Sequence, residues 1–549
     1  MTVSSQEPPS QELPAEKLPT DGPAEPPADV LVVGAGPTGL TLALTAHALG
    51  ARVRVVERRS TAFRPSRALI THPRTLEVLR PLGVVDALLD RADTSPAARV
   101  HLGSRVVPVR LGNFALPDTP YPHLSLLRQA DVEEVLGQAL AERGVPVERG
   151  TELAGFVSAP GDDPIQVVLR SRQGTREARY PVVVGCDGAH SAVRTASGIG
   201  WRGGGYRQDV VLADVELDGD LAPGVAHIVA GRAGLLFLFG LGERAGWRLL
   251  ATRPAPQPSS GAPPVPYGQS GPPLASADLQ RLIDDAGLAV RVAEVAWSTQ
   301  IRVQHRIATR YRRAGRFLAG DAAHVHSPAA AQGMNTGIQD AVNLGWKLAF
   351  ASSSVDRDRL LDSYQDERRP VARLVLAMTH LVFWAESAGD PVASTLRGWL
   401  APLAAPLVPW VLGRRRVVAE GIRVLSGLRF GYRASALSVS GSPVKGWVRP
   451  GDRLPDAPVV VDDRWVRLHE LTARPGVHVL TPADAPRLPV AGEYVRQHWL
   501  SRAPGPGVVA VRPDGYVGYR GQAVDQGLMT WLARVGALPA TLPRSAGGT

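Results

Sequence analysis

Apolar residues near the start of the chain form a short run, then a helical pattern, then a second run. Residues 29–33 (DVLVV) are a β-branched stretch that ends at Gly34, and residues 39–49 repeat apolar positions at helical spacing up to Gly50. Residues 52–56 alternate apolar and polar positions, as strands do. The order strand, helix, strand predicts a βαβ unit of about 30 residues.

The middle of the chain is rich in patterns typical of strands. Residues 128–143 predict a helix and residues 181–184 a short strand, and residues 205–250 alternate as several strands. A stretch rich in Pro, Gly and Ser at 253–273 predicts a surface loop. After this loop, Ser276 is the expected N-cap of a helix to residue 286, and residues 294–307 resume an extended pattern.

The last third begins with a short strand at 316–319, followed by a long helix at 333–351. Further helix is expected through about residue 436. The sequence at 449–455 (RPGDRLP) then breaks the pattern, and strands alternate with turns such as 512–515 (RPDG). A further domain is therefore expected to begin near residue 450.

Composition excludes several classes of protein. The formal charge is +10, but lysine occurs only at 17, 347 and 445, and the arginines are scattered rather than clustered with aromatic residues, so nucleic-acid binding is not expected. The single cysteine, Cys186, excludes an intrachain disulfide and fits a reducing cytoplasm. Residues 1–28 lack an apolar signal-peptide core and predict a disordered tail.

The most apolar long stretch, residues 399–413, is interrupted by three prolines and is too short to span a bilayer. It predicts a packed, broken helix, with an apolar lip that touches a membrane or admits a lipophilic substrate as the alternative. No membrane association is therefore expected.

The first loop fits the pattern G-x-G-x-x-G. Gly34 permits a tight turn, Gly36 lets the backbone approach a pyrophosphate, and Gly39 lets the helix pack on the strand. The phosphate is expected at the helix N-terminus, where free N–H groups and the helix dipole stabilise anions. Glu57, at the end of the second strand, is placed to accept hydrogen bonds from a ribose. These features together predict a bound dinucleotide.

Two aspartate turns, each after a short strand, decide which dinucleotide is expected. They are residues 186–194 (CDGAHSAVR) and residues 320–324 (GDAAH). With these motifs the chain resembles, over about residues 29–520, the class A flavoprotein monooxygenases, that is, the para-hydroxybenzoate hydroxylase family and especially its aromatic polyketide hydroxylase branch.

The resemblance implies roles for individual residues. Glu57 would hold the adenosine ribose, Arg67 the FAD diphosphate region and Asp321 the ribityl chain, while Gln129 lies along the cofactor and Asp187 serves both FAD and NAD(P)H. Residues 328–335 (PAAAQGMN) match the loop around the isoalloxazine ring, so Pro328 and Gly333 are candidates for the flavin loop. The full predicted cofactor site is Gly34, Gly36, Pro37, Thr38, Gly39, Glu57, Arg58, Arg67, Gln129, Asp187, Asp321, Gly333, Met334 and Asn335.

The chain departs from the family at Ala330 and Ala331, where one or two glycines are usual. The added methyl groups could narrow the space for dioxygen, or fix a different loop path if the glycines used positive φ. His324 and His326 form an H-x-H, but two ligands without a neighbouring carboxylate or cysteine make a poor metal site, so no metal is expected.

The implied reaction uses FAD, with NADPH or NADH and dioxygen as co-substrates. A flavin C4a-hydroperoxide would hydroxylate a phenolic polycyclic aromatic substrate of polyketide type. Baeyer-Villiger oxidation or oxidative inactivation of a polycyclic antibiotic is an alternative, and a non-catalytic flavin-binding carrier is another. Arg302 and Gln304 are candidate substrate contacts, although a position on the solvent face is the simpler interpretation of each; the substrate base is not identified.

The predicted fold is α/β, with a Rossmann-like FAD-binding domain, an inserted β-sheet substrate domain and a C-terminal thioredoxin-like domain. The thioredoxin-like domain contains no cysteine and cannot perform dithiol exchange. A monomer or homodimer is expected. The predicted division is a tail at 1–28, FAD-binding segments at 29–205 and 306–445, a substrate layer at 206–305 and the last domain at 450–549.

Overall fold

The structure is a computed structural model of the whole chain. It describes residues 28–62, 69–102, 105–222, 224–231, 234–240, 246–254, 271–328, 331–386, 410, 414–489 and 492–538. The predicted tail, most of the loop at 253–273 and nearly all of the apolar stretch at 399–413 lie outside these residues. Within the described part of the chain, no helix combines the length and the apolar character needed to cross a membrane.

A six-stranded sheet forms the centre of the molecule, with the strand order β17-β18-β11-β1-β2-β7. All pairs from β18 to β7 are parallel. The residues of β1 and β11 are buried, which explains why both strands are continuous valine-rich runs rather than alternating ones. The strands are β1 (Val30–Val33), β2 (Val53–Glu57), β7 (Val147–Arg149), β11 (Val182–Gly185), β17 (Arg312–Arg313) and β18 (Arg316–Leu318).

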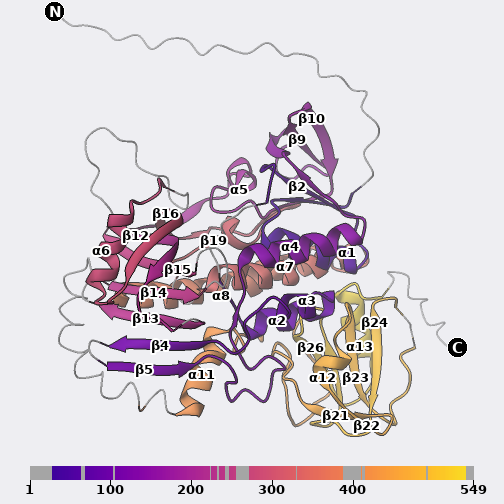
Figure 1. Cartoon of the computed structure of the whole chain (residues 1–549). Helices are drawn as coiled ribbons and strands as arrows, with labels where there is room; N and C mark the ends of the chain where they lie inside the picture. Colours follow the sequence, from indigo (N-terminus) through magenta and orange to yellow (C-terminus); the bar gives the residue numbers. More distant parts are fainter. Residues whose placement is uncertain are drawn as a thin grey trace, which may run out of the picture.

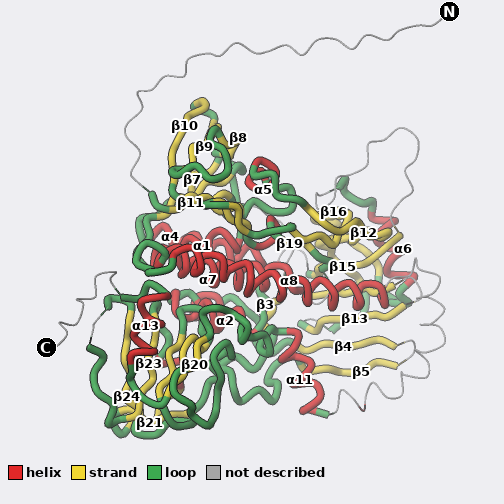
Figure 2. Tube along the Cα trace, turned by 180° about the vertical axis from the view of Figure 1, so that it is seen from behind, coloured by secondary structure: helices red, strands yellow, loops and turns green. Residues whose placement is uncertain are grey.

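Helix α1 (Pro37–Ala48) packs against α4 (Gln129–Glu142) and α7 (Gln332–Phe350) beside this sheet (Figure 1). A small antiparallel sheet lies on the other side, formed by β8 (Glu152–Phe156), β9 (Ile165–Ser171) and β10 (Gly174–Tyr180). Helices α7 and α8 (Arg357–Glu386) are in contact and run across the back of the molecule (Figure 2). The βαβ unit, its helix and the helix at 333–351 therefore form where the hydrophobic pattern predicts them.

An eight-stranded sheet follows the order β19-β16-β12-β15-β14-β13-β4-β5. Its strands are β4 (Ala97–Leu102), β5 (Arg105–Arg110), β12 (Trp201–Asp218), β13 (Val225–Gly231), β14 (Gly234–Gly240), β15 (Trp247–Pro254), β16 (Arg291–Ala308) and β19 (His324–Val325). Helix α6 (Ser276–Asp285) packs on it through Leu279 and Ile283. The residue at the N-cap of α6 is Ala275, and the expected cap, Ser276, is the first residue of the helix.

This sheet also differs from the predicted substrate layer in its membership. Strands β4 and β5 come from the segment assigned to the first FAD-binding part, and β4 pairs in parallel with β13, more than 100 residues later. Local alternation identifies a strand but does not identify its partner, because pairing depends on how distant segments meet.

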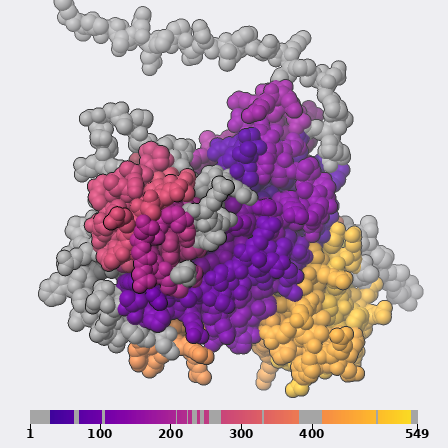
Figure 3. All heavy atoms as spheres, in the orientation of Figure 1, coloured from indigo at the N-terminus to yellow at the C-terminus, as the bar shows by residue number. Residues whose placement is uncertain are grey.

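A five-stranded sheet near the C-terminus has the order β20-β26-β25-β23-β24 and lies beside α2 (Pro73–Leu79) (Figures 1 and 2). Figure 3 shows the surface of this C-terminal part in yellow, against the indigo and purple N-terminal part. Its strands are β20 (Val439–Ser440), β23 (Val477–Pro482), β24 (Val495–Leu500), β25 (Val508–Val511) and β26 (Val517–Gly521). The expectation of further helix through about residue 436 is wrong at its end: α11 (Arg415–Leu425) stops earlier, and residues 426–438 contain turns and no helix.

The remaining elements are short. They are β3 (Ile70–Thr71), α2 (Pro73–Leu79), α3 (Val85–Leu89), β6 (Ser125–Leu126), α5 (Ala192–Ala196), β21 (Pro458–Val461), β22 (Arg464–Arg467), α12 (Leu468–Leu471), α13 (Gln526–Arg534) and the 3₁₀ turns Arg80–Leu82 and Gly320–Ala322.

Candidate functional site

The three glycines of the first loop have different surroundings. Gly34 has φ +106°, and a Cβ atom there would overlap the carbonyl oxygen of Cys186. A Cβ atom on Gly39 would overlap the carbonyl oxygen of Gly34. At Gly36, in contrast, no atom lies within 4 Å of the Cβ position. Two glycines are therefore required by packing, whereas the third keeps open space in front of the α1 N-terminus, where a phosphate can approach.

Thr38, on the first turn of α1, joins this loop to the third motif. A Cβ atom on Gly320 would lie 2.5 Å from Thr38 Oγ1, and one on Gly337 in α7 would overlap the same atom. Thr38 thus occupies the space left by two glycines that are distant in sequence. Pro37 precedes it at the start of α1, where the missing N–H of proline removes no helical hydrogen bond.

Glu57 lies beside the glycine loop because β1 and β2 are parallel neighbours. Its Oε2 accepts a hydrogen bond from the Ala35 N–H at 2.9 Å, and its Oε1 accepts one from the Arg59 N–H at 3.0 Å. Arg58 is exposed next to it. Arg67 lies outside the described residues.

Gln129 begins α4 and donates through Nε2 to Glu133 Oε1 at 2.7 Å. Burial raises the pKa of Glu133, and the nearby Glu57 carboxylate adds to this rise while Arg59 opposes it. The structure therefore brings Gln129 and Glu57 to the same edge of the sheet. Glu133 was not singled out in the sequence, where it is one of many helical glutamates.

Asp187, in the second motif, accepts hydrogen bonds within its own loop. Its Oδ2 accepts hydrogen bonds from the N–H groups of Ala192 at 2.7 Å and Val193 at 3.2 Å, at the start of α5. Burial raises the pKa of Asp187, and these hydrogen bonds oppose the rise. Its carboxylate thus shapes the loop after β11.

Arg194 connects the second motif to the third and was not predicted as a site residue. Its guanidinium donates to the carbonyl oxygens of Ala322 at 3.0 Å and Ala189 at 2.8 Å, and it lies 4.0 Å from the ring of Trp201. The motif C-D-G-x-x-S-x-x-R contained this arginine, but no local pattern indicates which carbonyls it reaches.

The third motif forms a 3₁₀ turn held by a buried carboxylate. Asp340, on α7, accepts from the Gly320 N–H at 3.2 Å and interacts with His324 Nε2 at 2.7 Å through Oδ2. Its Oδ1 accepts from Arg368 Nε at 2.6 Å, and the arginine keeps the pKa of Asp340 low against the effect of burial. Asp321, one residue after Gly320, is exposed. The turn thus places the Asp321 side chain at the surface, where a ligand can reach it.

The loop before α7 enters the helix through a left-handed residue. Ala331 has φ +53° and ψ +37° at the N-cap, a conformation that glycine adopts readily and alanine does not. Gly333, in the first turn, has open space around its Cβ position. Pro328 is exposed and Met334 is buried, while Ala330 lies outside the described residues.

Both polar atoms of the Asn335 side chain have hydrogen-bond partners within the protein. Its Oδ1 accepts from the His72 N–H at 2.9 Å and from Thr75 Oγ1 at 2.7 Å, and its Nδ2 donates to the carbonyl oxygens of Ile70 and Ala331. An amide side chain has no further hydrogen-bonding capacity. Asn335 therefore ties the start of α7 to residues 70–75, and only its backbone is available to a cofactor.

The two histidines of the H-x-H pattern have partners in the protein. His324 interacts with Asp340, and His326 Nδ1 lies 2.9 Å from the Ser327 carbonyl oxygen. Burial lowers the pKa of His326 to about 4. Within the described ranges, no cluster of three His, Cys, Asp or Glu side chains could hold a metal ion.

The candidate substrate contacts on β16 do not lie on a solvent face. Gln304 is buried, and Arg302 is three-quarters buried with its Nε 3.9 Å from Asp209 Oδ1. The simpler interpretation, that Arg302 and Gln304 lie on the solvent face of the sheet, is therefore wrong.

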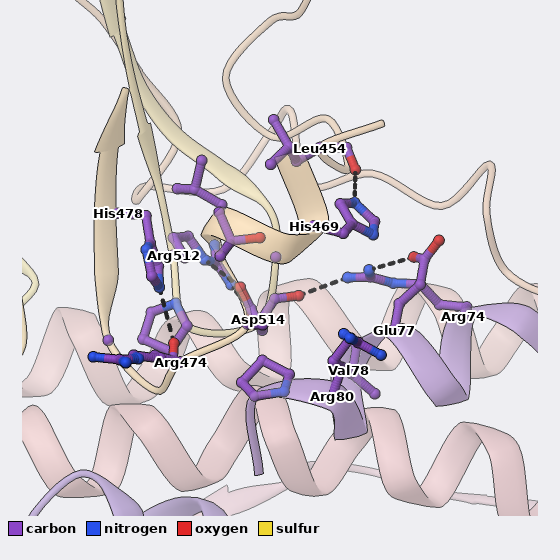
Figure 4. A pocket seen from close by; sticks show the side chains of 17 residues that line it. Arg74, Glu77, Val78, Arg80, Leu454, His469, Arg474, His478, Arg512 and Asp514 are labelled. Atoms are coloured by element: carbon purple, nitrogen blue, oxygen red, sulfur yellow. Dashed lines mark hydrogen bonds and ion pairs between the residues drawn. The ribbon is translucent and has the colours of Figure 1, made fainter. Parts of the chain in front are cut away.

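Two cavities lie where the C-terminal region, from residue 454 onward, contacts the rest of the chain. The smaller, of about 30 Å³, is lined by charged residues including Arg74, Glu77, His469, Arg512 and Asp514 (Figure 4). A more open hollow of about 820 Å³ is lined by residues from 113–122 and 456–470. Among the described residues that line either space, none belongs to the three motifs.

Comparisons with known proteins agree on one family. Residues 27–379 match the model of the FAD binding domain. The 6-methylpretetramide 4-monooxygenase of Streptomyces rimosus is 36% identical over 94% of this chain and 94% of its own length. The solved structure of the OxyS anhydrotetracycline hydroxylase from Streptomyces rimosus has a TM-score of 0.73 at 28% identity, covering 93% of this chain and all of the other. The ternary complex of aklavinone-11 hydroxylase with FAD and aklavinone has a TM-score of 0.70 at 27% identity, covering 92% and 98%.

Proposed function

Because the chain belongs to the flavin-dependent aromatic monooxygenases of the FAD binding domain family, we propose that it hydroxylates a phenolic, polycyclic aromatic compound of polyketide type. The observation that carries this proposal is the 36% identity to 6-methylpretetramide 4-monooxygenase along nearly the whole of both chains. Dioxygen, with NADPH or NADH, would complete the set of substrates.

The residues present fit FAD. Gly36 leaves the α1 N-terminus open, Glu57 lies beside the same loop, and Thr38 brings the turn at 320–322 and α7 against it. We assign to the cofactor site Gly34, Gly36, Pro37, Thr38, Gly39, Glu57, Arg58, Arg67, Gln129, Asp187, Asp321, Gly333, Met334 and Asn335. When bound, FAD supplies the redox and oxygen-activating chemistry, which no side chain can provide.

The chain itself supplies position and charge. The N-termini of α1 and α7 carry unpaired N–H groups that would contact FAD, and each would stabilise negative charge on it. Asp321 would accept hydrogen bonds from the ribityl hydroxyls. Asp187 and Asn335 would act by fixing the loops that carry the backbone contacts. Pro328 and Gly333 would border the reacting ring.

The larger units have proposed roles as well. The eight-stranded sheet, including β4 and β5, would form the substrate layer inserted into the FAD-binding domain, and the domain at 450–549 would be thioredoxin-like. In its sheet β23 and β24 are parallel while β25 and β26 are antiparallel. Since this domain has no cysteine, its role would be structural or at an oligomer interface.

Incubation with a panel of aromatic polyketides tests the proposal. With NADPH and oxygen, 6-methylpretetramide, anhydrotetracycline or aklavinone should give a product that contains one additional oxygen atom by mass spectrometry. A hydroxylated ring is stable to mild alkali, whereas a Baeyer-Villiger lactone opens by gaining water. Flavin that NADPH never reduces, with or without these compounds, would contradict an oxygenase function.

A further inference from the structure

Three ring side chains from separate elements meet next to the flavin loop. Tyr206 lies on β12, His305 on β16 and His380 on α8. The ring centroids of Tyr206 and His305 are 4.9 Å apart, those of Tyr206 and His380 5.6 Å, and those of His305 and His380 5.0 Å. None of the three belongs to a sequence motif, and together they form what we call the His–Tyr cluster.

The cluster borders the segment that leads into α7. Arg306, next to His305, pairs with Val325 of β19, which runs directly into Ser327 and Pro328. Ser327 donates from Oγ to the carbonyl oxygen of Thr379, the residue before His380, at 3.2 Å. The Ser327 side chain also hydrogen-bonds Tyr206. Strand β16 and helix α8, which carry His305 and His380, are therefore connected to the candidate flavin loop by these contacts. Strand β12 is connected to the same loop by the side chain of Tyr206.

A strand irregularity positions Tyr206. The register between β12 and β16 shifts between Gly205 and Asp209, so Tyr206 lies in a bulge rather than in the regular ladder. Bulges redirect side chains and are frequent beside active sites. The bulge turns the phenol ring of Tyr206 toward His305 and His380.

His305 has an unsatisfied polar atom. Its Nδ1 is buried and has no hydrogen-bond partner among the described residues. A buried polar group in this state costs about 1–3 kcal/mol, a cost that is accepted where a ligand supplies the missing partner. Tyr206 and His380 have partners already, since the Tyr206 hydroxyl lies 3.3 Å from His380 Nδ1.

The charges around the cluster favour a neutral imidazole. Burial lowers the pKa of His305, and the neighbouring His380 and Arg306 lower it further. Burial raises the pKa of Tyr206 to about 12, so its hydroxyl remains protonated at neutral pH. The acceptor for a proton in this cluster is therefore an imidazole, while the tyrosine acts as a hydrogen-bond donor.

We propose that His305 is the base that accepts the proton of the substrate's phenolic hydroxyl, with Tyr206 and His380 as positioning residues. The substrate O–H bond breaks, an N–H bond forms at His305 Nδ1, and the electron pair remains on the substrate oxygen. The resulting phenolate is more electron-rich at its ortho and para carbons than the phenol. The proton returns to water when the product leaves. This inference rests on the proposed function, since it requires a phenolic substrate.

Ionisation of a bound dye tests the base without turnover. Alizarin, a polycyclic phenol, changes colour when it loses its proton, so its absorbance on the FAD-loaded enzyme can be titrated against pH. The wild-type enzyme should lower the ionisation pH of bound alizarin, and His305→Gln should raise it again by about one pH unit or more. Tyr206→Phe should give a smaller change. His101→Gln provides a matched control, because His101 lies on β4, at the far side of the same sheet.

Turnover provides a second readout. With a phenol that the wild-type enzyme hydroxylates, His305→Gln should lower kcat by about 10²- to 10⁴-fold with a smaller change in KM. The remaining activity should rise with pH as the phenol ionises in solution, and NADPH oxidation should yield hydrogen peroxide instead of product. FAD content and melting temperature, compared with those of His101→Gln, report whether the variant is folded.

The outcomes separate the two proposals. If no polycyclic phenol is hydroxylated but His305→Gln still shifts the ionisation of alizarin, the proposed function fails and the base assignment stands. If the wild-type enzyme leaves the ionisation pH of alizarin unchanged, or if His305→Gln matches the wild type in titration and pH profile, the assignment of His305 is overturned. Should His305→Gln lose FAD, Tyr206→Phe decides by the same titration, and a result equal to that of His101→Gln overturns the proposal.

Discussion

Asp321 is the side chain on which the FAD assignment can be tested most directly. It is exposed on a 3₁₀ turn whose Gly320 N–H donates a hydrogen bond to Asp340. Asp321→Ala should weaken FAD binding about tenfold to a hundredfold, since hydrogen bonds to a charged group contribute about 1.5–3 kcal/mol. The measurement is the ratio of flavin to protein absorbance after purification and dialysis.

Asp484→Ala serves as the control for this change, because Asp484 is an exposed aspartate in the C-terminal region. Equal flavin content in both variants would remove Asp321 from the site. A lowered melting temperature of the apoprotein in Asp321→Ala alone would show that its role lies in folding.

Ala331 explains part of the departure from the family's glycine pattern. The alanine adopts the left-handed conformation that a glycine would adopt, which costs an L-residue about 1–2 kcal/mol. The alanine at position 331 therefore adds conformational strain at the N-cap of α7.

At the scale of elements, the contact between α1 and α7 depends on glycines of α7 that face threonines of α1. A Cβ atom on Gly345 would lie 2.8 Å from Thr45 Cβ and 3.2 Å from the carbonyl oxygen of Leu42, and Gly337 faces Thr38 in the same way. In the proposed cofactor site both helix N-termini would contact FAD, so this contact between α1 and α7 would set the distance between them.

Gly345→Ala should push the two helices apart. Overpacking of this kind costs typically about 1–3 kcal/mol, and the displaced N-termini should also reduce FAD retention. Urea unfolding and flavin content measure the two effects. Gly421→Ala, in α11, is the matched control, because that position is exposed with open space at its Cβ and lies within a helix, so the same substitution should stabilise by about 0.5–1 kcal/mol. Similar effects of both substitutions would contradict the close-contact argument.

At the scale of the whole molecule, a buried charge network joins the C-terminal sheet to the helices. Arg512 donates two hydrogen bonds of 2.7 Å to Glu367 on α8 and also pairs with Asp514. Lys347 on α7 donates to Glu367 at 2.7 Å, and burial lowers the pKa of this lysine to about 8. These side chains are almost completely buried, so removing one partner leaves an uncompensated charge.

Arg512→Met should therefore lower the free energy of unfolding by about 3–5 kcal/mol. Arg433→Met tests the same change in an exposed pair with Asp452 and should cost less than about 1 kcal/mol. Hydrogen exchange should show the loss at both β25 and α8 if the network couples the sheet to the helices. Equal losses in the two variants, or a loss confined to the sheet, would refute this coupling.

Local patterns along the chain predicted the first βαβ unit, helix α7 and the family. The valine runs of β1 and β11 reflect the burial of both strands, and the three glycines and the two aspartate turns reflect the backbone conformation of tight turns. The contacts that these segments make with one another became known from the folded structure. Three contacts join segments that are distant in sequence. Strands β4 and β5 pair into the large sheet, the Asn335 side chain hydrogen-bonds residues 70–75, and the rings of Tyr206, His305 and His380 lie close together. Periodicity records which side of an element is buried, but the partner on that side is selected by packing of the whole chain.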